Sequence, residues 1–120
     1  AHGGDAAAVR ADMSALREEG GFRVGQGALS ALRDWFASGR ASEEETAAAI
    51  ARTLRGTGEL VCPHTAVGLH VAEGFLGAVP MVTLATAHPA KFPDAVEAAT
   101  GIRPPLPPRM ADLYDRPERV

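Results

Sequence analysis

Apolar residues recur at helical spacing in the first half of the chain. The spacing of three or four positions predicts helices over residues 5–19 and 28–38. A third predicted helix opens at Ser42 and ends near Gly56. Ser42 and Glu45 form the pattern of a capping box, in which each side chain binds the backbone amide of the other residue. The first 58 residues are therefore expected to be helical.

The second half changes to short, continuous apolar runs. Residues 59–62 and 81–86 read as buried strands, each followed by a predicted helix, over 65–76 and from Pro93 to Gly101. Two parallel strands cannot cover their own edges. We therefore expect an α/β fold, with three helices followed by a parallel β-α-β-α unit that belongs to a larger sheet.

This pattern divides the chain into three segments. Residues 1–58 form the helical segment, residues 59–102 the β-α-β-α unit, and residues 103–120 a proline-rich, extended tail with one helical turn near Met110–Leu113. All 120 residues would form a single domain or part of one. Because the chain does not begin with Met, we expect it to be processed or to be a piece of something longer.

Composition narrows the function classes. Hydrophobic residues make up 46% of the chain, but no run approaches the roughly 18 apolar residues of a membrane span. The net charge of −3 argues against nucleic-acid binding, which needs a basic surface. The single Cys62 excludes an internal disulfide and fits a reducing compartment. A buried, inert thiol is a simpler interpretation of Cys62 than a nucleophile beside His64.

Three motifs carry only weak signals. The G-x-G sequence within residues 24–30 resembles the start of a dinucleotide loop but also fits a flexible turn. His64, His70 and His88 lack the spacing of a metal site, so no metal is expected. The prolines of residues 104–108 could bind a partner in polyproline conformation, although a tail lying on the domain is the simpler interpretation.

Two loops follow the predicted strands and carry the strongest functional signal. Residues 63–68 join a strand to a helix, where backbone amides attract anions, although an ordinary capped helix start fits equally well. Residues 84–92 end an apolar strand in the Thr86 hydroxyl and then present His88 and Lys91. Ligands bind outside the carboxyl ends of strands in open α/β sheets. The two loops are therefore expected to converge on one crevice, unless the second is a plain solvated turn.

The same loops resemble a known family. The sequences P-H-T-A-V-G at 63–68, T-A-H-P-A-K-F-P at 86–93 and P-L-P-P at 105–108 are similar to the C-terminal part of the threonine synthase family. The resemblance implies a lyase of threonine biosynthesis with the fold type II of pyridoxal-phosphate enzymes. It further implies the substrate O-phospho-L-homoserine, which reacts with water to give L-threonine and phosphate in the cytoplasm.

The resemblance also assigns roles to residues of this chain. Thr86 would meet the pyridine nitrogen of pyridoxal 5'-phosphate through its hydroxyl, which cannot keep that nitrogen fully protonated as a carboxylate would. Lys91 would contact the substrate phosphate. The candidates for lining the substrate site are His64, Thr65, Ala87, His88 and Lys91.

Two departures from the family pattern limit these expectations. The family carries an acidic residue where Cys62 stands. The lysine that holds the cofactor as a Schiff base belongs to the family's N-terminal half, and Lys91, the only lysine, stands in a different motif. We therefore expect no catalytic residue here, an N-terminal part of the same polypeptide as partner, and no activity of this segment alone. The alternative is a stand-alone, non-catalytic interaction module that uses the proline-rich tail or the acidic Glu43–Glu45 helix face.

Overall fold

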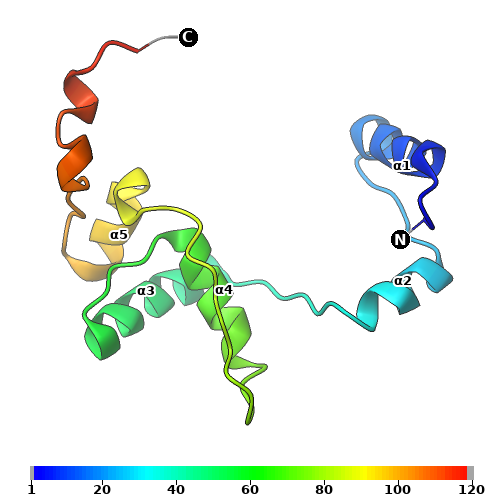
Figure 1. The fold of residues 1–120 in the computed structure, drawn as a ribbon, viewed down its shortest axis with the longest axis horizontal. Coiled ribbons are helices and arrows are strands. Elements are labelled where there is room, and N and C mark those ends of the chain that lie inside the picture. The colour runs from blue at the N-terminus through cyan, green and yellow to red at the C-terminus, as the bar shows by residue number, and fades with distance from the viewer. Residues whose placement is uncertain (1, 119–120) are drawn as a thin grey trace. The chain divides into compact units, whose positions relative to one another are not determined.

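The structure, a computed structural model, describes residues 2–118, and its regular elements there are all helical (Figure 1). The chain divides into two compact units, residues 1–38 and 39–120. The elements in chain order are α1 (Ala6–Glu19), α2 (Gln26–Arg33), α3 (Glu43–Thr57), α4 (Pro63–Glu73), the 3₁₀ turn η1 (Pro89–Lys91), α5 (Pro93–Thr100), and the 3₁₀ turns η2 (Pro108–Met110) and η3 (Leu113–Asp115).

The first unit contains α1 and α2. Asp5 caps α1 by accepting from the backbone amides of Ala7 and Ala8, and Gly20 ends it in the left-handed conformation at φ +80°. The prediction for α1 is thus confirmed to within one residue. Helix α2 begins two residues before the start of the predicted range 28–38 and ends five residues before the end of that range. The aromatic residues beyond its end are solvent-exposed, with Trp35 at 85%.

The second unit is built around α3. Helices α4 and α5 both pack against α3, and the fully buried side chains of Ile50 and Val96 meet in this core together with Ala66. The capping box at the start of α3 is present, because Ser42 and Glu45 exchange hydrogen bonds of 2.7 and 3.2 Å. The predicted helix from Pro93 to Gly101 is also confirmed as α5.

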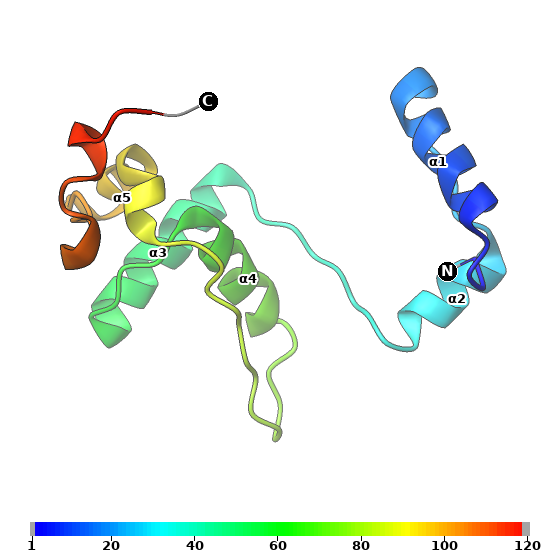
Figure 2. The ribbon, with the colours of Figure 1, turned by 45° about the horizontal axis from the view of Figure 1, so that its top comes forward.

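The predicted α/β fold class is wrong for this chain. Residues 2–118 contain no strand, so the expected parallel β-α-β-α unit is absent from them. The segment 59–62 is an extended connection whose apolar side chains pack on the helical core, with Cys62 fully buried. Residues 81–86 run as an extended loop, and Figure 2 shows the segment between α4 and η1 reaching away from the helices.

The physical reason lies in what an apolar run can signal. Runs such as 81–86 have the β-branched, continuous apolarity of a buried strand, but a strand also needs a neighbour for its backbone hydrogen bonds. No such neighbour pairs with either segment among the described residues. Both segments therefore stay extended without forming a sheet, and Val82 is 79% exposed.

The capping box predicts a pH dependence of the stability of α3. The backbone N–H of Ser42 donates to the Glu45 carboxylate and, with smaller help from His70, lowers the pKa of Glu45 below its ordinary value near 4.5. A lowered folded-state pKa means that the ionised carboxylate stabilises the helix above the ordinary pKa, and that this stabilisation is lost as pH falls through the lowered pKa. Urea unfolding monitored by circular dichroism across this acidic range should show the loss.

The matched control is Glu45→Gln, which keeps the reciprocal hydrogen bonds but does not titrate. Its stability should change less than that of the parent chain over the same pH range. An equal loss in both chains would place the titration at another group.

Candidate functional site

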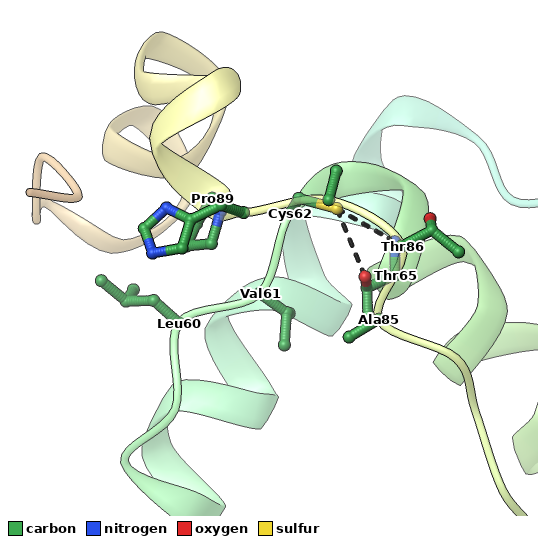
Figure 3. A pocket seen from close by; sticks show the side chains of 9 residues that line it. Leu60, Val61, Cys62, Thr65, Ala85, Thr86 and Pro89 are labelled. Atoms are coloured by element: carbon green, nitrogen blue, oxygen red, sulfur yellow. Dashed lines mark hydrogen bonds between the residues drawn. The ribbon is translucent and has the colours of Figure 1, made fainter. Parts of the chain in front are cut away.

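The segment over residues 60–65 and the loop over residues 84–92, which the sequence singled out, meet at one cleft. Its volume is about 360 Å³, and it lies between the start of α4 and the loop that leads into η1 (Figure 3). The lining comes from two stretches, Leu60, Val61, Cys62 and Thr65 on one side and Ala85, Thr86, Ala87, His88 and Pro89 on the other. The convergence expected from strand ends is therefore produced without strands.

Cys62 organises the first wall of the cleft. It is the N-cap of α4, and its Sγ accepts from the backbone N–H of Thr65 at 3.5 Å and lies 3.3 Å from the Thr65 hydroxyl oxygen (Figure 3). Pro63 occupies the first turn, where its missing N–H costs nothing. The predicted helix over 65–76 therefore starts two residues earlier than expected and ends at Glu73 rather than near 76.

Glycine at position 68 lets the second wall approach α4. A Cβ built on Gly68 would lie 3.0 Å from Cγ2 of Thr83, which is closer than most Cβ contacts. Ala66, two residues earlier, is completely buried in the core. Gly68 thus allows a close approach of the 81–86 segment to α4.

Thr86 presents its hydroxyl on the second wall. The residue is exposed, and within residues 2–118 its side chain makes no hydrogen bond. Thr65, by contrast, is buried and its hydroxyl is in contact with Cys62, so it forms part of the wall.

The remaining predicted residues lie beside the cleft, around the ring of Phe92. The rings of His64 and Phe92 have centroids 4.8 Å apart and are tilted by 49°. The Lys91 Nζ lies 5.8 Å from the Phe92 ring centroid, within the range of a cation–π contact. Neither His64 nor Lys91 lines the cleft itself.

A second, more apolar cavity of about 410 Å³ lies next to η1 and contains Lys91. The proline-rich tail closes it with Leu106, Met110 and Tyr114, among others. His88 lines both this cavity and the cleft. No sequence pattern predicted this cavity, although Leu106, Met110 and Leu113 recur in the tail at helical spacing.

His88 also caps η1. Its Nδ1 accepts from the backbone N–H of Ala90 at 3.2 Å, and its backbone adopts the extended conformation of an N-cap. Among the described residues, no three His, Cys, Asp or Glu side chains are arranged to hold a metal ion. None of the helices in that same range has the length and apolarity needed to cross a bilayer.

Comparison with known proteins gives the family. The family model described as "Threonine synthase, C-terminal" matches residues 65–120. The threonine synthases of Pseudomonas aeruginosa and Corynebacterium glutamicum are 43% and 36% identical, each over 98% of this chain. The chain belongs to the threonine synthase family. It corresponds to the C-terminal portion, as the sequence resemblance implied.

Solved structures agree with this threonine synthase assignment. The chain matches a pyridoxal-phosphate-bound threonine synthase from Brucella melitensis with a TM-score of 0.83 and 52% identity, over 98% of this chain and 25% of that one. The yeast threonine synthase matches with a TM-score of 0.71 and 29% identity, over 91% of this chain and 25% of that one. The chain spans about a quarter of the length of the curated relatives that it matches, 26% for each of the two bacterial enzymes.

The cap at Cys62 predicts a graded effect of substitution in this threonine synthase segment. Cys62→Ala removes the acceptor for the Thr65 amide and should lower the free energy of unfolding, at most by the roughly 0.5–2 kcal/mol that loss of an ordinary N-cap costs. Cys62→Ser keeps an acceptor and should lose less. Urea unfolding of the three chains measures the difference, and equal losses for Ser and Ala would show that packing of the sulfur, not capping, matters at this position.

Proposed function

We propose that the chain is the C-terminal part of a cytoplasmic threonine synthase, a pyridoxal-phosphate-dependent lyase. The whole enzyme would convert O-phospho-L-homoserine and water to L-threonine and phosphate. The observation that carries this proposal is the Thr86 hydroxyl, which makes no hydrogen bond within residues 2–118 and lies at a cleft between residues 60–65 and the family-like loop over 84–92. Membership of the threonine synthase family and the likeness to a pyridoxal-phosphate-bound member support it.

One residue of the cleft, Thr86, has the chemistry to meet the ring nitrogen of the cofactor. Pyridoxal phosphate, when bound, supplies an electron-withdrawing ring that stabilises negative charge on a substrate carbon. The Thr86 hydroxyl can donate to or accept from the ring nitrogen, and it has no competing partner in residues 2–118. It carries no charge, so it positions the nitrogen without holding a proton there as strongly as a carboxylate would.

The chain does not supply the group that attaches the cofactor. Lys91 is its only lysine, and it lies beside Phe92 and the apolar cavity, outside the lining of the cleft. An amine that attacks the cofactor aldehyde must be positioned against it. The proposal therefore assigns the attaching lysine to another part of the polypeptide and makes residues 1–120 inactive alone.

Replacement of Thr86 tests the cofactor assignment in the whole polypeptide. The parent protein should show the visible absorption of bound pyridoxal phosphate and release phosphate from O-phospho-L-homoserine. Thr86→Val keeps the shape but removes the hydroxyl, so activity should fall by about 3-fold to 10-fold, which is the effect of one neutral hydrogen bond. Thr86→Ser is the matched control and should stay near the parent rate.

Two results would contradict this assignment. Equal rates for Thr86→Val and the parent would show that the Thr86 hydroxyl does not contact the cofactor. A colourless whole polypeptide that releases no phosphate would overturn the enzyme proposal and favour a non-catalytic interaction module.

Lys91 is proposed to contact the phosphate group of the substrate. It forms no ion pair with the acidic side chains of the described residues, so its charge is available to an anion. Lys91→Met keeps the length of the side chain but removes the charge, and KM for O-phospho-L-homoserine should rise by about 10-fold to 100-fold. Steady-state kinetics measure this, and an unchanged KM would exclude the contact. Lys91→Arg, which keeps the charge, should recover part of the affinity.

A further inference from the structure

The imidazole of His88 is fixed in one tautomer by the backbone. The N–H of Ala90 donates to Nδ1 at 3.2 Å. A nitrogen that accepts a hydrogen bond carries no proton, so the proton of the neutral ring is on Nε2. The cap of η1 therefore leaves the Nε2–H of the neutral ring as the hydrogen-bond donor of His88.

The position of His88 gives this donor a use. The residue is exposed and lines both the cleft that contains Thr86 and the neighbouring cavity that contains Lys91. His88 thus lies at the boundary between the cleft and the cavity, and in the sequence it stands between Thr86 and Lys91. The same three-residue turn that His88 caps ends at Lys91.

We propose that His88 binds the substrate. Its Nε2–H donates to an acidic oxygen of the same ligand whose phosphate group Lys91 contacts. This inference rests on the proposed function, because it takes the phosphate ester as substrate. The ammonium of Lys91 provides charge, and the imidazole provides a directional hydrogen bond at the boundary of the cleft. The cap on Ala90 holds the ring so that the donor is in place before the ligand binds.

Asparagine and glutamine separate the two roles of His88 in the whole polypeptide. His88→Asn places an amide oxygen near the position of Nδ1, so it keeps the cap but removes the distant donor. Its KM for O-phospho-L-homoserine should rise about tenfold or more, with a smaller change in kcat. His88→Gln places an amide N–H near the position of Nε2 and should recover part of the affinity. If His88 serves only as a cap, Asn will keep the parent KM, and this result would overturn the proposal.

His70→Asn is the matched control. His70 is in α4 and its Nε2 lies 3.7 Å from a Glu45 carboxylate oxygen, outside the lining of both cavities. The same substitution there should leave KM unchanged. An equal rise in KM for both Asn variants would indicate a general structural effect and overturn the specific role of His88.

A second measurement does not depend on turnover. Nitrogen-15 NMR of histidine-labelled whole polypeptide should show the His88 proton on Nε2, and inorganic phosphate should shift the Nε2 signal. A proton on Nδ1, or no response to phosphate, would overturn the proposal. If the polypeptide does not turn over O-phospho-L-homoserine but the phosphate response is present, the proposed function fails while the donor role of His88 stands.

Discussion

The packing of α4 and α5 against α3 positions the cleft. Each of these two helices begins at a site loop, α4 directly after Cys62 and α5 directly after Phe92. The burial of Ile50 and Val96 between the helices therefore fixes the point from which each loop leaves the core. Because the core is small, the loss of one large buried side chain would disturb both walls of the cleft.

Two unusual N-caps hold the backbone of the two cleft walls in place. Ser, Thr, Asp and Asn are the common N-cap residues, but here the thiol of Cys62 and the imidazole of His88 each accept one backbone N–H. A sulfur is a weak acceptor, so complete burial and the close Thr65 hydroxyl contribute to the order of the first wall. In the second wall, the hydrogen bond from the Ala90 amide also selects the tautomer of His88 that carries its proton on Nε2. The same hydrogen bond that caps η1 therefore decides which nitrogen of His88 can donate to a ligand.

The helices were predictable because their signals are local. The capping box of Ser42 and Glu45, the proline at the start of α5 and the glycine at its end act within a few residues of the positions that they control. The site loops were found for a similar reason, since T-A-H-P-A-K-F is a distinctive sequence. The contact between His64 and Phe92 joins residues 28 positions apart, and no local pattern could predict it.

The strand predictions failed because apolarity and β-branching describe a preference for burial, not the presence of a pairing partner. Residues 81–86 satisfy the first condition, while the described chain offers no backbone to pair with them. Cys62 was read as the end of a strand because thiols are rare caps, although its place before Pro63 also fits an N-cap.

The exposed apolar side chains bear on the proposed partner. After α4, Phe75, Leu76 and Val79 are all more than half exposed, and so are Val82 and Leu84. Exposed large apolar side chains that gather in one segment mark places where other protein is bound. The described residues do not cover these side chains, whereas the curated relatives are about four times as long as this chain. A surface that needs further polypeptide to bury it, next to a cleft that needs a lysine from elsewhere, is what we expect of one wall of a larger threonine synthase site.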